Sequence, residues 1–281
     1  MILVKNNASF QETTMPVADF LVSKLPFSIA AYATYLQSIE AHKKQSVYAW
    51  ALKAYDGIHG VIVRNGPTMY PVFDDIGEEH DLKNIRLDTP IHAFHGKARD
   101  VKLLERYAAG CGVRPIECID YDVMVSAVAP PAESLYAGPA GLIIRQPGPS
   151  DSTSLFLLQA GYEQEEVLPK HGRFNPAVCR MLIERIVRHD RIMIAELGGR
   201  IVGKINTNAV MPSWFQIGGV YVHPSYRKRG IATRMTAVFV QGLLDEGKQV
   251  SLFVKKEKPA ARALYSKAGF KTAGDYRISY Y

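Results

Sequence analysis

The joint between a strand and a helix at residues 220–235 constrains the fold more than any other stretch of this sequence. The stretch reads VYVHPSYRKRGIATRM. Its opening residues end an apolar run that predicts a strand, and Pro224 closes that run. After Gly230, apolar residues recur at helical spacing and predict a helix from residue 231 to about residue 246. They are Ile231, Met235, Val238, Phe239 and Leu243. A strand that turns directly into an amphipathic helix is typical of a mixed α/β domain.

The remainder of the second half is also predicted to be a mixture of strands and helices. Turn residues and periodicity predict strands at 141–146, 215–222, 249–254 and 275–281, and a hairpin at 191–210 that turns at Gly198-Gly199. Helices are expected at 151–168, with Asp151 as its cap, at 176–190, and at 259–268, stopped by Gly269. The predicted order is therefore β, α, α, β, β, β, α, β, α, β.

A segment rich in proline and glycine precedes this pattern. Residues 129–141, APPAESLYAGPAG, contain three prolines and two glycines among small residues, which is typical of a linker. We therefore expect an N-terminal α/β domain at 1–130 and a second domain at 141–281.

The first half is less regular in sequence. It predicts a long helix at 17–40, a hairpin at 47–73 with an Asn65-Gly66 turn, a strand at 90–96, a helix at 98–110 and a strand at 119–128. Its ending, DYDVM, echoes DYRIS near residue 275. Both a degenerate internal repeat and a chance similarity are compatible with so short an echo.

Charge is distributed unevenly along the 281 residues. Residues 1–140 carry 13 basic and 16 acidic side chains, whereas residues 141–281 carry 21 and 11, so the net charge of +7 comes from the second half. This half is expected to meet an anion: a phosphorylated cofactor, an acidic substrate or nucleic acid. A solvated basic face is the alternative.

Compartment and metal content follow from weaker signals. The apolar run before Lys5 is four residues long, and no stretch approaches the roughly 20 apolar residues of a membrane span, so we expect a cytoplasmic protein without a membrane partner. Cys111, Cys118 and Cys179 show no C-x-x-C spacing, and His92 and His95 would point to opposite faces of a strand. We therefore expect reduced cysteines and no metal site.

The turn at 227–233 has the chemistry of a phosphate cradle. A helix that begins at Gly230 presents free backbone N–H groups and the positive end of its dipole. Gly230 and Ala232 allow the backbone to approach an anion, and Arg227, Lys228 and Arg229 add positive charge.

A second motif, KPAARALYSKAGF at residues 258–270, follows the strand predicted at 249–254. Together the two motifs resemble the GNAT superfamily of N-acetyltransferases, whose acetyl-CoA loop reads Arg/Gln-x-x-Gly-x-Gly/Ala and whose next helix reads Asn-x-x-Ala-x-x-Leu-Tyr and ends in Gly-Phe. The first motif is matched by Arg227, Gly230 and Ala232, and the second by Ala261, Leu264, Tyr265, Gly269 and Phe270. The likeness covers about residues 141–281. The chain resembles two-domain bacterial members whose N-terminal half is diverged and GNAT-like.

The resemblance implies roles for individual residues. Val220, Tyr221 and Val222 would contact the pantetheine arm of acetyl-CoA, with the Val220 N–H polarising the thioester carbonyl. Residues 227–233 would wrap the pyrophosphate: Arg227, Lys228, Arg229, Gly230, Ile231, Ala232 and Thr233. Tyr265 would protonate the departing thiolate.

Two positions depart from the family pattern. Lys258 replaces the asparagine of the second motif and is expected to contact a CoA phosphate instead. Gln216 stands where many members have a glutamate base, and glutamine cannot accept a proton. Glu196, Glu257, His223 or a water chain could replace that base. Four residues are guesses for the lining of the site where the amine, the acceptor of the acetyl group, would bind: Asn206, Asn208, Trp214 and Gln216.

Three functions compete on this evidence. The resemblance favours transfer of an acetyl group from acetyl-CoA to a primary amine, on a small molecule or a peptide, by direct attack in a ternary complex. None of the cysteines lies near either motif in sequence, so a covalent thiol intermediate has no obvious nucleophile. A CoA-binding module that does not catalyse is the alternative, favoured by Gln216 and Lys258. Nucleic-acid binding ranks last because the basic residues are scattered over several elements. The sequence leaves the acceptor, the oligomeric state and the acyl chain length open.

Overall fold

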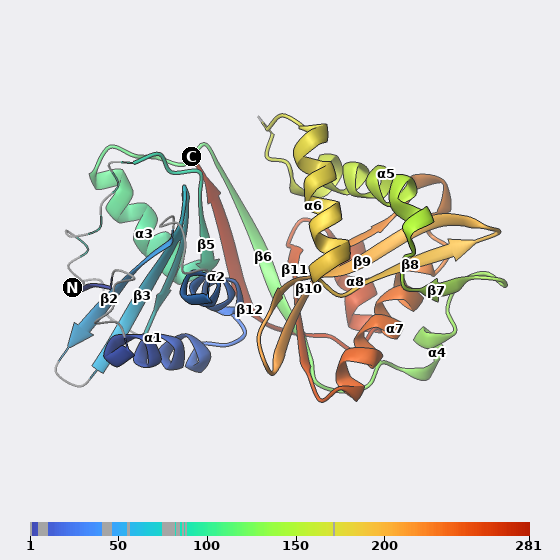
Figure 1. Cartoon of the computed structure of the whole chain (residues 1–281), viewed down its shortest axis with the longest axis horizontal. Helices are drawn as coiled ribbons and strands as arrows, with labels where there is room; N and C mark the ends of the chain where they lie inside the picture. Colours follow the sequence, from blue (N-terminus) through green and yellow to red (C-terminus); the bar gives the residue numbers. More distant parts are fainter. Residues whose placement is uncertain are drawn as a thin grey trace. The chain divides into compact units, whose positions relative to one another are not determined.

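The computed structural model describes residues 2–4, 11–40, 47–54, 57–74, 82, 85, 87, 89–170 and 172–281 (Figure 1). The chain forms two compact units. Unit 1 consists of Met1–Val123 and Gly274–Tyr281, and unit 2 consists of Met124–Ala273. The chain therefore passes between units twice, once within a strand at Glu117–Ser126 (β6) and once within a strand at Lys271–Tyr280 (β12). The segment at 129–141, which the sequence suggests as a linker, belongs to unit 2.

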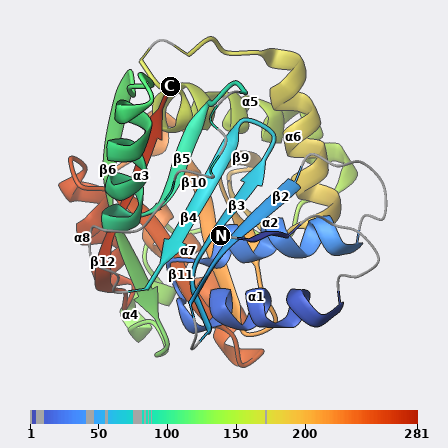
Figure 2. The same cartoon turned by 90° about the vertical axis from the view of Figure 1, so that its left-hand side faces the viewer.

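Unit 1 is built on a mixed sheet with the strand order β1-β2-β3-β4-β5-β12-β6. Figure 2 shows β2, β3, β4 and β5 side by side. Strands β4 and β5 are parallel, whereas β12 is antiparallel to β5, from Tyr276 opposite Lys97 to Tyr280 opposite Ala93. The other strands of the unit are β1 (Ile2–Val4), β2 (Val47–Ala54), β3 (Gly57–Asn65), β4 (Thr68–Phe73) and β5 (Ala93–Lys97). Its helices are α1 (Gln11–Ser23), α2 (Ile29–Glu40) and α3 (Ala98–Gly110).

Two sequence predictions for unit 1 are wrong in detail. The single helix expected at 17–40 is two helices, because Pro26 lacks an N–H and disfavours helical geometry at Leu25. The hairpin expected at 47–73 is a three-stranded meander, since the chain also reverses before Gly57, whose φ is 140°. Residues 55 and 56 of that reversal lie outside the described residues. The Asn65-Gly66 turn and helix α3 are confirmed.

Unit 2 contains the first nine of the ten predicted elements in the predicted order, with a short extra helix α4 (Ala132–Leu135) before them, and the tenth element, β12, lies mostly in unit 1. Its strands lie in the order β11-β10-β9-β8-β7, in which only β10 and β11 are parallel. The strands are β7 (Ile143–Arg145), β8 (Ile192–Leu197), β9 (Arg200–Val210), β10 (Trp214–Val222) and β11 (Gln249–Lys255). The helices are α5 (Ser152–Tyr162), α6 (Pro176–His189), α7 (Ile231–Asp245) and α8 (Pro259–Lys267).

Helix α7 packs on one face of this sheet and forms the larger core. Met235, Phe239 and Leu243 are buried against Phe215 and Leu252. A fully buried side chain of this size contributes about 1.5–3 kcal/mol, so this face dominates the stability of the unit. The predicted apolar face of α7 is confirmed except at Val238, which is half-buried.

Helices α5 and α6 form a second core with β8. Leu155, Ile183, Ile186, Ile192 and Ile194 are buried there. The helix predicted at 151–168 ends at Tyr162 and continues as one π-helical turn at Glu163–Val167. Turns of this kind are found frequently at functional sites.

Candidate functional site

A cavity of about 490 Å³ opens in unit 2 where β10 and β11 separate. The parallel pairing runs from Trp214 with Gln249 to Ile217 with Leu252, and β10 then continues through an irregular register to Val222. The cavity is walled by the end of β10, the start of α7 and one side of α8, and its volume is within the range of about 300–1,000 Å³ typical of small-molecule sites. Its lining comprises Glu166, Val220, Tyr221, Val222, Tyr226, Arg227, Lys228, Gly230, Ile231, Ala232, Thr233, Lys258, Pro259, Ala260, Ala261, Leu264 and Tyr265.

The start of α7 has the backbone geometry of a tight cradle. Gly230 has a φ of 77°, and a Cβ there would lie 2.8 Å from the backbone nitrogen of Gly138. Lys228 also adopts a left-handed conformation, with a φ of 61°, which costs a residue with a side chain roughly 1 kcal/mol. The first N–H groups of the helix have no acceptor within it, because the first helical hydrogen bond runs from the Arg234 N–H to the Gly230 carbonyl. Such a helix start attracts anions.

The structure brings together ten of the eleven residues that the sequence assigns to the cofactor. The exception is Arg229, which does not line the cavity. Its Nη2 donates a hydrogen bond to the Ser225 carbonyl at 3.2 Å, and its guanidinium lies 5.5 Å from the centre of the Tyr226 ring. Arg229 therefore braces the turn.

Two of the cavity's cations are paired with carboxylates that the sequence analysis missed. Arg227 Nη2 lies 2.7 Å from Glu165 Oε2, and Arg227 Nε donates to the Val222 carbonyl at 2.9 Å. Lys258 Nζ lies 2.5 Å from Glu166 Oε1. Both glutamates belong to the π-helical turn, inside the segment predicted as plain helix. The run EQEE at 163–166, three acids within four residues, is the signal that could have drawn attention to it.

Glu165 links two walls of the site. The Tyr221 hydroxyl donates to Glu165 Oε1 at 2.6 Å. Burial alone would raise the pKa of Glu165, but the hydrogen bonds from Tyr221 and Arg227 outweigh it and lower this pKa below its ordinary value. Burial, and then Glu165 itself, raise the pKa of Tyr221 to about 12. Glu165 is thus an ionised acceptor for a neutral phenol.

Tyr265 projects from α8 into the cavity. Its ring packs edge-on against Phe270, with 6.0 Å between ring centres. Burial, followed by the neighbouring Tyr162 and Glu166, raises the pKa of Tyr265 well above its ordinary value. The phenol therefore keeps its proton at neutral pH and can act as a hydrogen-bond donor within the cavity.

The candidate bases named from the sequence do not line this cavity. Gln216, at the position where many family members have a glutamate base, is 4% exposed, and its Oε1 has no hydrogen-bond partner among the described residues. Glu257 is exposed, and the exposed His223 caps the turn after β10 by accepting from the Ser225 N–H at 3.3 Å.

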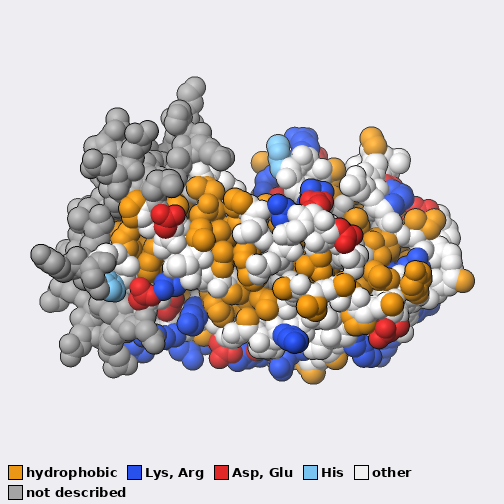
Figure 3. Space-filling model, turned by 90° about the horizontal axis from the view of Figure 1, so that it is seen from below, with side chains coloured by type: hydrophobic (Ala, Val, Ile, Leu, Met, Phe, Trp, Pro, Cys, Tyr) orange, Lys and Arg blue, Asp and Glu red, His pale blue; other side chains and the backbone are white. Residues whose placement is uncertain are grey.

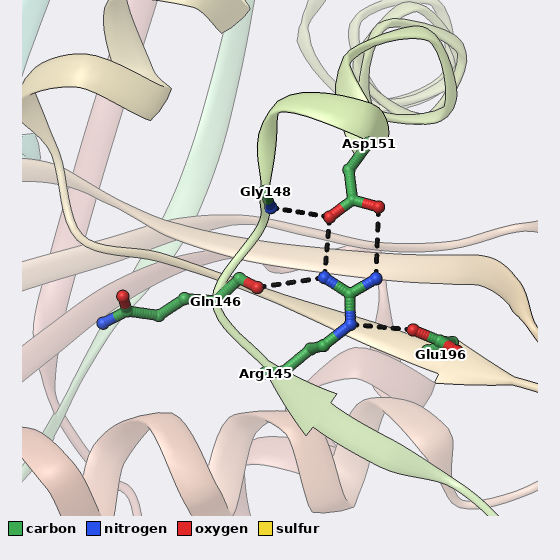
Figure 4. Close-up of polar contacts among 5 residues, drawn as sticks. All are labelled: Arg145, Gln146, Gly148, Asp151 and Glu196. Carbon is green, nitrogen blue, oxygen red and sulfur yellow. Dashed lines mark hydrogen bonds and ion pairs between the residues drawn. The ribbon is translucent and has the colours of Figure 1, made fainter.

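Glu196 accepts a hydrogen bond from Arg145, as Figure 4 shows. Arg145 Nε donates to Glu196 at 2.7 Å, and its Nη1 and Nη2 donate to Asp151 at 2.6 and 3.1 Å. Asp151 also accepts from the Gly148 N–H at 2.7 Å, so it fixes the turn before α5 and makes no side-chain cap for that helix. The guanidinium of Arg145 thus joins β7, β8 and the start of α5.

The guessed acceptor residues also lie away from the cavity lining. Asn206 is buried and Asn208 is exposed on β9, while Trp214 is half-buried at the start of β10. Asn206 Oδ1 instead accepts a hydrogen bond from Lys204, a fully buried lysine that the sequence analysis did not single out.

Surface charge, metal-binding groups and the length and hydropathy of the helices provide three further observations. On the face that Figure 3 shows, basic side chains are interspersed with acidic and hydrophobic ones and do not merge into one patch. Within the described residues, no group of three or more His, Cys, Asp or Glu side chains could hold a metal ion. No helix of those residues is both long enough and apolar enough to cross a membrane.

The separated parallel strands, the cradle at the start of α7 and the mixed sheet define the GNAT acyltransferase fold, and solved structures share it. A Drosophila protein aligns over 96% of this chain and 97% of its own, with a TM-score of 0.66 and 14% identity. A GCN5-related N-acetyltransferase from Sphaerobacter thermophilus aligns over 94% and 92%, with a TM-score of 0.60 and 17% identity. A tandem GNAT protein from the clavulanic acid biosynthesis pathway aligns over 99% and 97%, with a TM-score of 0.59 and 13% identity.

Sequence comparison places this fold in a family. Residues 160–270 match the family model described as the acetyltransferase (GNAT) family. Comparison with curated proteins gave no match. Unit 2 therefore contains a GNAT acetyltransferase domain, and the enzyme class it indicates is acyl transfer from an acyl-CoA.

Proposed function

We propose that the protein transfers an acetyl group from acetyl-CoA to a primary amine, by direct attack of the amine in a ternary complex. The observation that supports this most is the cavity itself, which gathers the cradle of α7, the end of β10 and Tyr265 around one space. Bound acetyl-CoA would supply an activated thioester as the acyl donor.

The residues of the cavity fit such a donor in two parts. Val220, Ala261 and Leu264 offer an apolar wall for the pantetheine arm, whereas Arg227, Lys228 and the N–H groups of α7 offer positive charge for phosphates. Ion pairs at such a rim are worth about 0–1 kcal/mol, so phosphate can replace the carboxylates of Glu165 and Glu166 at small cost.

Two steps of the transfer have a candidate residue on the chain. The Val220 N–H would polarise the thioester carbonyl, and Tyr265 would donate its proton to the departing sulfur. The new bond joins the amine nitrogen to the carbonyl carbon as the carbon–sulfur bond breaks. The proton lost by the amine would pass to water, since Gln216 cannot accept it.

A non-catalytic CoA-binding module is the second candidate function. It is favoured by Gln216, which stands where many relatives carry a glutamate base, and by Lys258, which replaces an asparagine. In that case the cavity would bind CoA, but amines would not promote its release.

A calorimetric titration with acetyl-CoA tests the cavity. Ala260 on α8 lines the cavity and is exposed, so Ala260→Trp should fill the space without burying the new ring in the core. Ala263→Trp, on the same helix, also exposed and outside the lining, is the matched control. We expect saturable binding by the wild type and the control and none by Ala260→Trp. Equal binding by all three proteins would show that acetyl-CoA binds elsewhere.

Release of free CoA in the presence of a panel of primary amines separates the two functions. Amine-dependent release would exclude the non-catalytic module. Tyr265→Phe should then lower kcat by about 10²-fold, the usual contribution of a general acid, with little change in the Kd for acetyl-CoA. An unchanged kcat would remove Tyr265 from the chemistry.

A further inference from the structure

Lys204 lies on β9 with no exposed surface, yet its ammonium nitrogen is fully supplied with acceptors. Nζ donates to Asn206 Oδ1 at 2.8 Å and to the Gly219 carbonyl at 3.0 Å. It also lies 5.0 Å from the centre of the Tyr162 ring, over which a cation is attracted. These three partners match the three N–H bonds of a lysine ammonium.

The local backbone of β10 is shaped around this contact. The pairing with β9 shifts between Gly218 and Tyr221, and Gly219 adopts a φ of 58°. A Cβ at position 219 would lie 2.6 Å from Lys204 Nζ and would collide with Asn206 Oδ1. Asn206 is held in turn, because its Nδ2 donates to the Thr207 carbonyl at 3.0 Å. Glycine at 219 therefore allows the ammonium to reach the backbone of β10.

The carbonyl that Lys204 binds belongs to the same peptide group as the N–H of Val220. The peptide group is planar and conjugated, so a cation at its oxygen fixes the plane and draws electron density away from the nitrogen. Hydrogen bonds in such a chain strengthen one another, and the N–H becomes a better donor. Val220 lines the cavity, whereas Lys204 does not.

We propose that Lys204 is a positioning residue for acyl transfer: it holds and polarises the Gly219–Val220 peptide so that the Val220 N–H can bind the carbonyl oxygen of the acyl donor. This inference rests on the function proposed above. Because Lys204 is buried on the face of β9 covered by α5 and α6, it acts through the peptide and does not touch substrate.

The titratable groups around Lys204 come from four elements. They are Tyr162 on α5, Glu163 in the π-helical turn, Cys179 on α6 and Tyr221 on β10. Burial lowers the pKa of Lys204 to about 7, while Glu163 and Cys179 act in the opposite sense. Burial raises the pKa of Cys179 and of Tyr221 to about 12. Neither the thiol nor the Tyr221 phenol titrates between pH 6 and 9, where Lys204 does.

The first test needs neither a ligand nor a variant of Lys204. The protein is labelled with ¹⁵N-valine, and the Val220 amide is assigned by comparison with Val220→Ile. We expect its ¹⁵N and ¹H shifts to titrate near pH 7, as the ammonium loses its proton. A Val220 signal that stays constant from pH 6 to 9 would overturn the coupling between Lys204 and this peptide.

The second test measures the acyl donor directly. Acetyl-CoA with a ¹³C carbonyl is bound at pH 6.5, and the infrared band of the thioester is compared between the wild type, Lys204→Met and the control Lys271→Met, which changes an exposed lysine. We expect the wild type and the control to lower the carbonyl frequency and Lys204→Met to lower it less, with a Kd within about threefold. With an amine present, kcat of Lys204→Met should fall about tenfold at an unchanged KM for acetyl-CoA.

The outcomes separate the two proposals. Equal carbonyl bands in the wild type and in Lys204→Met would overturn the role of Lys204 and leave the acyltransferase intact. A wild type that does not bind acetyl-CoA would overturn both, even if the Val220 amide titrates.

Discussion

The buried Lys204 predicts that the stability of unit 2 rises with pH over a range in which most proteins are insensitive. Burial lowers the pKa of its ammonium from 10.5 to about 7, whereas in the unfolded chain this pKa returns to about 10.4. Between these values the unfolded chain binds a proton that the folded chain has released. The free energy of unfolding therefore increases with pH and, far from both pKa values, does so by about 1.36 kcal/mol per unit.

The magnitude over an accessible range follows from these two pKa values. At pH 7.0 the folded-state group is half protonated and at pH 8.5 it is almost neutral, so the contribution of Lys204 to the free energy of unfolding rises by about 1.5 kcal/mol. Lys204→Met lacks this contribution. The difference in stability between wild type and variant should thus change by about 1.5 kcal/mol in favour of the wild type.

Urea unfolding followed by tryptophan fluorescence measures this difference. The chain has two tryptophans, Trp50 in unit 1 and Trp214 in unit 2, so a Trp50→Phe background makes the signal report unit 2. Ionisation of Cys179 in the unfolded chain near pH 8.5 affects both proteins and cancels. A difference that stays constant between pH 7.0 and 8.5 would refute the reasoning, because Lys204 would then keep its ordinary pKa in the folded protein.

Three further predictions concern other contacts. Glu166→Gln should tighten acetyl-CoA binding two- to fivefold, because Lys258 no longer has to leave a carboxylate. Calorimetric titration of the wild type and the variant measures both affinities, and a lower affinity of Glu166→Gln would contradict the prediction. Lys228→Gly should raise the free energy of unfolding by up to about 1 kcal/mol, because glycine adopts the left-handed conformation without strain. The same change should weaken acetyl-CoA binding, because the cavity loses a positive charge. A lower melting temperature than that of the wild type would disprove the predicted stabilisation. Arg145→Met should destabilise unit 2 by about 2 kcal/mol because Asp151 and Glu196 lose a charged donor, and unchanged urea unfolding would contradict it.

The elements of unit 2 could be predicted because their signals are local. Alternation from Phe215 to Val222 marks β10, and the spacing of Ile231, Met235 and Phe239 marks the buried face of α7. The cavity lining followed from two motifs of fixed spacing, which the fold brings together. The break at Pro26 was also a local signal, but the apolar pattern on both sides outweighed it.

The missed features depend on contacts between distant parts of the chain. Glu165 and Arg227 are 62 residues apart, and Glu166 and Lys258 are 92 apart, so neither pair leaves a pattern in sequence. Lys204 stands in an alternating strand, where a lysine is ordinarily assigned to solvent. Only the tertiary structure shows that α5 and α6 cover that face and that the carbonyl of Gly219 accepts a hydrogen bond from the ammonium.

The place of β12 has a consequence for how the protein is made. This strand lies between β5 and β6 of unit 1, but the ribosome adds it only after residues 127–270, which separate it from β6 in the chain. Until β12 has been synthesised, the edges of β5 and β6 lack their native partner strand and can pair with other strands. Unit 1 is first in sequence and last to be completed, and a single cut within residues 129–141 would not yield it as a finished piece.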